Sequence, residues 1–242
     1  MNTAIILAAG VGQRMRNGGL PKQFLKLMGK PIIIYTLEKF EDCHDIDQII
    51  IVCHAGYVEY MQDLVASYHI KKVKSIIVGG TDRQDSLCRG LQEACDCGAA
   101  EEDIVVIHDG VRPLVSEFII QENLRVAEKY GSAITVHPVT ESVVITEDEN
   151  VAFSDFKKRT ATYSMTSPQS FQLGKIKEAY EKVKNLDDDI PLLDAAMVYA
   201  KCGGEIKLVK EQSANIKITT PEDFYFLKAI LELEENKYIF GL

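Results

Sequence analysis

Five charged residues stand where the chain is expected to turn, and together they could bind a polyphosphate. Arg14 and Lys22 flank the glycines that follow the first apolar segment of the sequence. Arg83 follows a second pair of glycines, and Asp109 and Arg112 stand at the end of a later apolar run. Cations beside exposed backbone amides are a common way to hold phosphate oxygens. The residue types therefore indicate an anion-binding site.

The first of these turns, Gly10-Val-Gly12, matches neither of the two standard phosphate-binding motifs. A dinucleotide fingerprint needs a third glycine three residues further on, and the chain has Met15 there. The Gly-Lys-Ser/Thr of a P-loop does not occur in the sequence. Arg14 and Lys22 could bind a polyphosphate without either motif. The alternative interpretation is an ordinary strand-to-helix turn with two solvated cations.

Composition excludes several classes of protein. The chain has 242 residues, of which 46% are hydrophobic and 26% charged, as expected for a folded protein rather than a disordered one. A net charge of -9 argues against a nucleic-acid partner, because duplex binding depends on basic surface. No apolar run approaches the ~18 residues of a membrane span. The six cysteines form no Cys-x-x-Cys pair, which indicates reduced thiols and a cytoplasmic location.

Alternating hydrophobic segments predict the fold. Short apolar runs at 48–53, 73–78 and 104–109 are separated by stretches with helical spacing. This alternation is typical of an α/β protein with a Rossmann-like, mostly parallel sheet flanked by helices. Ligands of such sheets bind at the carboxyl ends of the strands. The charged residues named above should therefore meet at one edge of the sheet.

Asp109 is the candidate metal ligand. A carboxylate at the end of a strand, among phosphate-binding cations, suits Mg²⁺, which prefers carboxylate and phosphate oxygens. The alternative is that Asp109 caps the following turn. The preceding His108 should point to the opposite face of the strand, and we expect it to be a buried structural residue.

The regular alternation stops between Ile134 and Phe171. This part reads as two extended segments around the acidic turn 147–150, which together form an arm at about 138–168. A hairpin of this kind has no core of its own and needs a surface to pack on, so it could reach a second subunit. We expect the whole chain, 1–242, to be one domain that carries this arm.

Six short motifs, in this order, resemble those of the cytidylyltransferases that activate small sugar-alcohol phosphates, the family of methylerythritol-phosphate and ribitol-5-phosphate cytidylyltransferases. The resemblance covers nearly the whole chain. The motifs are Leu7-Ala-Ala-Gly-x-Gly-x-Arg-Met15, Pro21-Lys-Gln23, Gly79-Gly-x-x-Arg-x-x-Ser86, His108-Asp-x-x-Arg-Pro113, Pro168-Gln169 and Asn215-Ile-Lys-Ile-Thr219.

The resemblance implies a homodimer that uses CTP as substrate and Mg²⁺ as cofactor, with Mn²⁺ able to substitute. It implies catalytic roles for Arg14, Lys22 and Lys217. Asp109 would be the metal ligand, and the arm would lend residues to the partner's site. The implied nucleotide-binding residues are Ala8, Ala9, Gly10, Gly12, Gly80, Arg83, Ser86 and Asp109. The implied acceptor-binding residues are Gly110, Ser142, Arg159 and Ser167.

The departures from the family pattern fall on the acceptor side. Ser167 stands where the family has a threonine, and Glu141-Ser142 where it has Asp-Thr. The eight-residue step from Arg14 to Lys22 resembles the ribitol branch, because the methylerythritol branch is often one residue shorter there. We therefore expect D-ribitol 5-phosphate as acceptor, with 2-C-methyl-D-erythritol 4-phosphate as the alternative.

Two other classes of function are compatible with parts of the sequence. A nicotinamide or flavin oxidoreductase would need the third glycine and an acidic residue after the second strand, where His54 stands. A nucleotide-binding regulator without catalysis could keep the fold and the first loop. Retention of every cation implied by the resemblance favours an enzyme.

Overall fold

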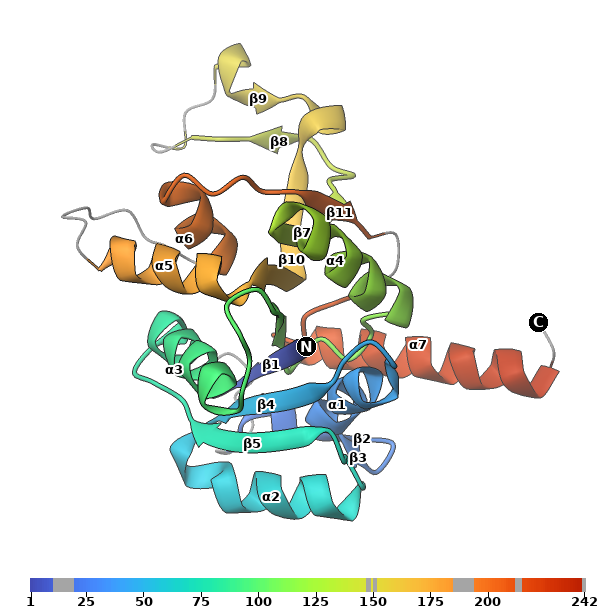
Figure 1. Cartoon of the computed structure of the whole chain (residues 1–242). Coiled ribbons are helices and arrows are strands. Elements are labelled where there is room, and N and C mark those ends of the chain that lie inside the picture. The colour runs from blue at the N-terminus through green and yellow to red at the C-terminus, as the bar shows by residue number, and fades with distance from the viewer. Residues whose placement is uncertain (11–19, 147–148, 150–151, 185–193, 212–214, 241–242) are drawn as a thin grey trace.

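The computed structural model describes residues 1–10, 20–146, 149, 152–184, 194–211 and 215–240. Its centre is a mixed seven-stranded sheet with the strand order β11-β7-β10-β6-β1-β4-β5 (Figure 1). The strands of this sheet are β1 (Asn2–Ala8), β4 (Gln48–Cys53), β5 (Val73–Val78), β6 (Ile104–Asp109), β7 (Ser132–Pro138), β10 (Tyr163–Gln172) and β11 (Leu208–Lys210).

Helices cover both faces of the sheet, as the α/β prediction requires. One face packs on α1, α2 and α4, and the other on α3, α5 and α6. Strands buried on both faces are continuously apolar, as β4 is. The helices of the described chain are α1 (Ile32–Asp42), α2 (Val58–Ser67), α3 (Arg83–Asp96), α4 (Glu117–Tyr130), α5 (Leu173–Val183), α6 (Ala195–Lys201) and α7 (Pro221–Phe240).

Side chains at the helix ends explain where several helices begin. Asp82 accepts from the amide of Asp85 at 2.8 Å and caps α3. In the same way Ser116 caps α4, which ends at Gly131 with a φ of 89°. These caps satisfy backbone donors that have no partner within the helix. The cap on α3 places the start of that helix at Arg83.

Strand pairing is parallel over the first half of the sheet and mixed beyond it. β1 lies between β4 and β6, parallel to both. β10 lies between β6 and β7 and is antiparallel to both, while β11 is parallel to β7. The strand β10 therefore includes the end of the extended arm that we expected at about 138–168, and places it within the main sheet.

Short elements complete the chain. The β8–β9 hairpin lies apart from the main sheet, at the opposite end of the molecule from α2 (Figure 1). The remaining short elements are β2 (Lys26–Leu27), β3 (Lys30–Pro31), β8 (Val143–Val144), β9 (Phe156–Lys157), η2 (Lys22–Phe24), η3 (Ala55–Tyr57), η4 (Phe153–Asp155) and η5 (Arg159–Ala161).

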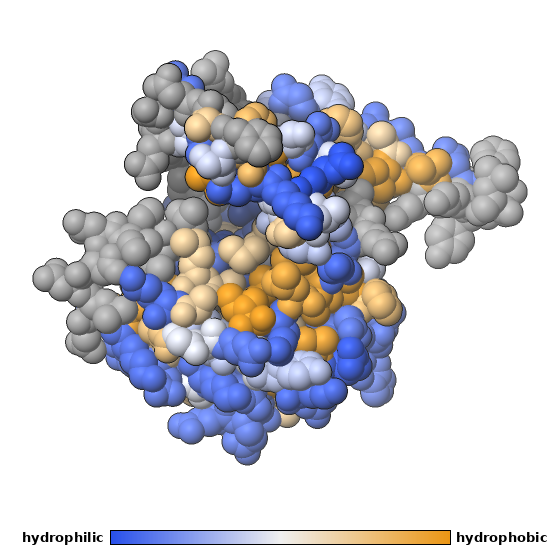
Figure 2. Space-filling model, turned by 90° about the horizontal axis from the view of Figure 1, so that it is seen from above, coloured by the Kyte–Doolittle hydropathy of each residue, from blue (hydrophilic) through white to orange (hydrophobic). Residues whose placement is uncertain are grey.

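The last helix, α7, projects from the body (Figure 1). Its Leu227 is fully buried against Ile218 and Val111, in a cluster separate from those on the sheet faces. Hydrophobic residues are visible along its projecting part in the view from above (Figure 2), where Leu233 is 55% exposed. No helix in the described ranges combines the length and hydrophobicity of a membrane span.

Candidate active site

The strand order itself predicts where a ligand binds. From β1 the chain proceeds to β4 and β5 on one side and then crosses to β6 on the other side of β1. The carboxyl ends of β1 and β6 therefore meet at the point where the strand order reverses, and ligands of open α/β sheets bind there. The register places Leu7 opposite Asp109 at this edge.

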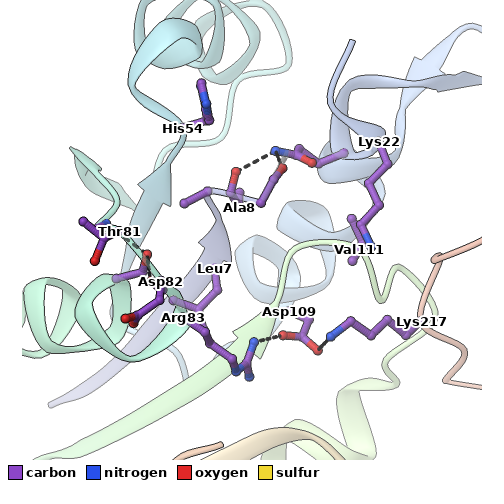
Figure 3. A pocket seen from close by; sticks show the side chains of 15 residues that line it. Leu7, Ala8, Lys22, His54, Thr81, Asp82, Arg83, Asp109, Val111 and Lys217 are labelled. Carbon is purple, nitrogen blue, oxygen red and sulfur yellow. Dashed lines mark hydrogen bonds and ion pairs between the residues drawn. The ribbon is translucent and has the colours of Figure 1, made fainter. Parts of the chain in front are cut away.

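A cavity of about 440 Å³ lies at this point (Figure 3). Loops that follow β1, β4, β5 and β6 form its walls, together with η2 and the segment before α7. It is lined by Leu7, Ala8, Ala9, Gly10, Lys22, Gln23, His54, Gly80, Thr81, Asp82, Arg83, Ser86, Asp109, Val111 and Lys217.

Asp109, the last residue of β6, holds three cations. Its Oδ1 lies 2.6 Å from Arg83 Nη1, and its Oδ2 lies 3.0 Å from Lys217 Nζ and 3.3 Å from Arg112 Nε. Burial by itself raises the pKa of the Asp109 carboxyl, but Arg83, Lys217 and Arg112 lower that pKa well below its usual range. The carboxylate is therefore charged, and the cluster carries two net positive charges.

A side chain of η2 holds the backbone at the end of β1. Gln23 is 1% exposed, and its Nε2 donates to the carbonyl oxygens of Ala8 at 2.7 Å and Gly10 at 3.1 Å. Its neighbour Lys22 reaches the cavity from the same short helix (Figure 3). The Pro-Lys-Gln motif thus supplies two residues that line the cavity, and the second of them also holds the backbone of Ala8 and Gly10.

The loop after β5 approaches the first loop closely because it begins with two glycines. A Cβ on Gly79 would lie 2.3 Å from the Cβ of Ala9, so a side chain there would push the two loops apart. The amide of Gly80 donates to Ser86 Oγ at 3.0 Å, and this hydroxyl donates to the Asp82 carbonyl at 2.7 Å. The glycines and Ser86 shape this wall of the cavity.

His108 lies on the opposite face of β6 from Asp109, as strand alternation predicts. It is fully buried and packs against Phe40 at 5.1 Å between ring centroids. Burial lowers the pKa of His108 to about 4, so the ring is neutral at pH 7. His108 has a structural place in the fold rather than a place on the wall of the cavity.

Most of the residues that the sequence indicated for the nucleotide meet in one place. Arg14 and Gly12 lie outside the described residues. The other predicted nucleotide-binding and catalytic residues all line the cavity: Ala8, Ala9, Gly10, Lys22, Gly80, Arg83, Ser86, Asp109 and Lys217.

The four predicted acceptor-binding residues do not line the cavity of their own chain. Gly110 is buried next to Ile33, and its amide donates to the Leu7 carbonyl at 2.9 Å. Ser167 is buried beneath Asp109 and accepts from the Asp109 amide at 3.1 Å. Ser142 and Arg159 are exposed on the segment that carries β8 and β9.

Sequence reasoning missed several residues of the site. Gln23 was visible only as part of a motif. Its role depends on the backbone carbonyls of Ala8 and Gly10, which lie 15 and 13 residues earlier in the chain. Arg112 was recognised as a cation at a strand end, but not as a partner of Asp109. His54 lines the cavity because it directly follows β4, a position that the carboxyl-end rule could have singled out.

Comparison with known proteins agrees with this fold and cavity. The family model for 2-C-methyl-D-erythritol 4-phosphate cytidylyltransferase (IspD) matches residues 2–233. Ribitol-5-phosphate cytidylyltransferase of Vibrio parahaemolyticus is 41% identical over 245 residues, covering 100% of both chains. The protein of that name in Streptococcus agalactiae is 38% identical over 244 residues, also with 100% coverage of both.

Solved structures show the same architecture. That of 4-diphosphocytidyl-2C-methyl-D-erythritol synthase from Anaerococcus prevotii has a TM-score of 0.80 and 26% identity, covering 96% of each chain. That of 2-C-methyl-D-erythritol 4-phosphate cytidylyltransferase from Thermus thermophilus has a TM-score of 0.71 and 26% identity, covering 95% of this chain and 98% of the other.

Fold and cavity thus define an enzyme of the nucleotidyltransferase class. More narrowly, the chain belongs to the IspD family of cytidylyltransferases, because the family model spans nearly all of it. Its expected α/β fold, with a mostly parallel sheet flanked by helices, is confirmed.

Proposed function

We propose that this enzyme transfers CMP from CTP to D-ribitol 5-phosphate, giving CDP-ribitol and pyrophosphate. The observation that carries the proposal is the cation cluster around Asp109, at the edge of the sheet where a nucleotide of this fold binds. Ribitol is preferred as acceptor because the full-length relatives at 38–41% identity bear that name.

A second candidate acceptor is 2-C-methyl-D-erythritol 4-phosphate, which the family model and the solved structures name. Both reactions start from the same nucleotide, so the cavity described above serves either one. The two candidates differ only in the polyol phosphate, whose predicted ligands lie at Gly110, Ser142, Arg159 and Ser167.

A pyrophosphate-release assay with CTP distinguishes the two acceptors. We expect turnover with ribitol 5-phosphate at least tenfold higher in kcat/KM than with methylerythritol 4-phosphate, and CDP-ribitol as the product identified by mass spectrometry. A reversed preference would establish the second candidate. If the protein binds CTP but releases pyrophosphate with neither of these acceptors nor with other polyol phosphates, it would instead be a regulator.

The proposed chemistry needs no general base. An oxygen of the acceptor's phosphate attacks the α-phosphorus of CTP, and the bond to pyrophosphate breaks. The second pKa of a phosphomonoester is about 6, so this oxygen is already largely ionised at neutral pH. Because one anion approaches another, the enzyme must mainly position the reactants and neutralise charge.

Four cations have a proposed part in that task. Lys22 and Arg14 hold the triphosphate and stabilise the departing pyrophosphate. Lys217 neutralises charge at the α-phosphate, and Arg83 extends the positive surface from the start of α3. In the described structure Lys217 is held 3.0 Å from Asp109, where the carboxylate keeps the ammonium directed into the cavity.

Asp109 is the proposed ligand of Mg²⁺. No group of three His, Cys, Asp or Glu side chains that could hold a metal occurs among the described residues. Mg²⁺ commonly uses one or two carboxylates together with substrate phosphates and water, so the charged carboxylate of Asp109 at the cavity wall has the right chemistry. Both of its oxygens contact cations here, so the ion would have to replace at least one of them. When bound, the ion would neutralise charge on the phosphates.

Chelation tests the metal. We expect pyrophosphate release to stop in EDTA and to return with Mg²⁺ or Mn²⁺, and Asp109→Asn to lose activity by a factor of at least about 10². Because Asp109 also binds three cations, circular dichroism should first establish that the variant is folded. Full turnover in EDTA would contradict the proposed metal.

The quaternary structure and location are proposed on other grounds. We propose that the chain is one nucleotidyltransferase domain whose arm, at about 138–168, contacts a second copy. Hydrophobic residues at the tip of this segment support the contact, with Ile145 62% and Phe156 51% exposed. A cytoplasmic location is proposed because CTP is a cytoplasmic metabolite and the six cysteines are free thiols.

A further inference from the structure

We propose that Ser167 and Asn215 are positioning residues of the reaction, which fix Asp109 and Lys217 through buried hydrogen bonds without contacting a substrate. This inference rests on the function proposed above and assigns Ser167 a role different from acceptor binding. Both residues are 2% exposed, and they belong to parts of the chain that are far from β6 in sequence.

The hydroxyl of Ser167 lies in a directed chain of hydrogen bonds. Its Oγ accepts from the amide of Asp109 at 3.1 Å and lies 3.1 Å from Nδ1 of His108. Nε2 of His108 lies 3.0 Å from the carbonyl oxygen of Arg112, which can only accept, so the hydrogen of the neutral ring sits on Nε2. Nδ1 is then an acceptor, and the single hydroxyl proton of Ser167 is donated to it.

These hydrogen bonds begin and end on the same short turn, residues 109–112. The amide of Asp109 and the carbonyl of Arg112 are thereby fixed relative to β10, and with them the carboxylate that faces the cavity. The proton of Ser167 is committed to His108, so this hydroxyl has no donor left for a phosphate oxygen of the acceptor. A positioning role explains both its burial and its partners.

Asn215 connects the same turn to the segment that carries Lys217. Its side-chain Nδ2 donates to the backbone carbonyl of Ser167 at 2.7 Å and to Glu211 Oε2 at 3.0 Å. The backbone carbonyl of Asn215 accepts from Arg112 Nη1 at 2.9 Å. Lys217 follows two residues later. The segment is thus tied to the turn after β6 and to β10 just before Lys217 reaches Asp109.

Because catalysis here depends on position, a small displacement has a large effect. Misplacing a catalytic group by about 1 Å can cost on the order of 10²-fold in rate. Removing the Ser167 hydroxyl leaves the Asp109 amide and His108 Nδ1 without their partner and should shift the turn. The expected consequence is a loss in kcat rather than in substrate affinity.

The kinetic test compares three serine variants by pyrophosphate release. We expect Ser167→Ala to lower kcat by about 10–100-fold, with the KM for CTP and for the acceptor within about twofold of wild type. Ser167→Thr keeps the hydroxyl and should restore most of kcat. Ser170→Ala is the matched control, because Ser170 is fully buried on the same strand and its hydroxyl has no hydrogen-bond partner in the described structure.

Two kinetic results would overturn the proposal. A rise of tenfold or more in the KM for the acceptor, at unchanged kcat, would mean that Ser167 binds the acceptor. Equal losses in Ser167→Ala and Ser170→Ala would mean that only packing matters. Asn215→Ala should lower kcat in the same way, and the double variant with Ser167→Ala should lose less than the product of the two single losses, because the residues share one network.

A spectroscopic test does not depend on turnover. In wild-type protein with ¹⁵N-labelled histidine, NMR should show His108 as the Nε2-H tautomer at neutral pH, and Ser167→Ala should change the Nδ1 signal. An Nδ1-H tautomer in the wild type would refute the chain of hydrogen bonds. If wild-type protein releases no pyrophosphate with any acceptor, the proposed function fails, and the NMR result still decides the network.

Discussion

Asp109 shows how a strongly acidic protein can attract an anion. The chain as a whole carries a net charge of -9, yet Arg83, Arg112 and Lys217 outnumber the one carboxylate that they surround. Asp109 keeps the three cations close together, where their mutual repulsion would otherwise separate them. A polyphosphate that enters the cavity therefore meets a preassembled positive cluster, which is the arrangement that electrostatic catalysis requires.

The two lysines of the cavity should be needed for turnover and not for folding. We expect Lys217→Ala and Lys22→Ala to lower kcat/KM by a factor of about 10²–10³, because each removes charge that stabilises the transition state. Steady-state pyrophosphate release measures the effect. Lys228→Ala is a suitable control, since that lysine is half exposed on α7 and pairs with Glu232 at 3.6 Å.

Thermal unfolding should accompany these measurements. Lys217 is 36% exposed, so its loss is expected to change the melting temperature little. Folded Lys217→Ala or Lys22→Ala protein with activity close to that of the Lys228→Ala control would contradict the roles given to these lysines.

His108 should make the protein less stable in mild acid. Burial lowers the pKa of His108 in the folded protein from 6.5 to about 4, so folding favours the neutral ring. The unfolded chain takes up this proton first as the pH falls. The free energy of unfolding should therefore decline between pH 6.5 and 4, by about 3 kcal/mol from this residue.

Urea unfolding at pH 7, 6, 5 and 4.5 measures this decline. The window lies above the ordinary pKa of an aspartate, so Asp109, whose folded pKa is lowered, adds its own loss of stability only at lower pH. His108→Gln cannot take up the proton and should show a smaller slope of stability against pH. The same slope in wild type and variant would show that His108 does not cause it.

At the scale of elements, the apolar strands were predictable and β10 was not. The runs at 48–53 and 104–109 have the same bounds as β4 and β6, because strands buried on both faces are mostly hydrophobic. The run at 73–78 has the bounds of β5, an edge strand that is only partly buried. β10 contains Pro168, three serines and one threonine, and its register with β7 shifts between Met165 and Gln169. Its place is determined by two neighbouring strands and not by its own hydrophobic pattern.

For the site, the residues that line the cavity could be predicted from the sequence, but most of their contacts could not. The residues that line the cavity follow strands or lie in short motifs, so their order in the chain was informative. Their contacts with each other were less so, because they join distant parts of the chain. The bond between Asp109 and Ser167 spans 58 residues and involves a backbone amide, a partner that side-chain chemistry alone does not reveal.

The helix α7 should be anchored by one of its two ends only. Leu227 is fully buried against Ile218 and Val111, whereas Leu233 on the same helix is 55% exposed. We expect Leu227→Ala to reduce the free energy of unfolding by about 2–5 kcal/mol, and Leu233→Ala to change it by less than about 0.5 kcal/mol.

Chemical denaturation of the two variants makes a matched comparison, since the same side chain is removed from the same helix. Because Ile218 directly follows Lys217, Leu227→Ala should also lower kcat. A loss of stability for Leu233→Ala as large as that for Leu227→Ala would show that another surface covers the projecting part of α7.

At the scale of the molecule, the β8–β9 hairpin has exposed hydrophobic residues and no core of its own. Val144, Ile145 and Phe156 are 38%, 62% and 51% exposed, and the hairpin has only two short strands. Such a hairpin is marginally stable alone. Arg159 is next to it, and its nearest hydrogen-bond partner is the Thr140 carbonyl, 3.5 Å from Nη1.

If the hairpin packs on a second copy, Arg159 should serve the partner's site. A planar guanidinium can bind two phosphate oxygens at once, which suits the acceptor's phosphate. We expect Arg159→Ala to raise the KM for the acceptor far more than that for CTP. In a mixed dimer of Arg159→Ala and Lys22→Ala chains, one site receives both defects and the other neither. Two inactive parents should then give a hybrid with up to about half of wild-type activity.

The hybrid requires proof that mixing has occurred, for example by tandem purification with two different tags. Verified mixed dimers without activity would mean that Arg159 acts within its own chain or not at all. A protein that is monomeric at assay concentrations and fully active would contradict the dimer itself.

The position of β10 has a consequence for the order in which a newly made chain can become active. β6 and β7 leave the ribosome before β10, and residues 163–172 later fill the space between them. Until then β6 has one unpaired edge and β7 has two, because β11, the other neighbour of β7, is made later still. Exposed strand edges invite association with other chains, so an incomplete chain that stalls before β10 is a hazard to the cell. Lys217 arrives later still, whereas the first loop was made at the start. The two ends of the protein must therefore meet before any chemistry is possible, and a truncated chain cannot carry out the reaction prematurely.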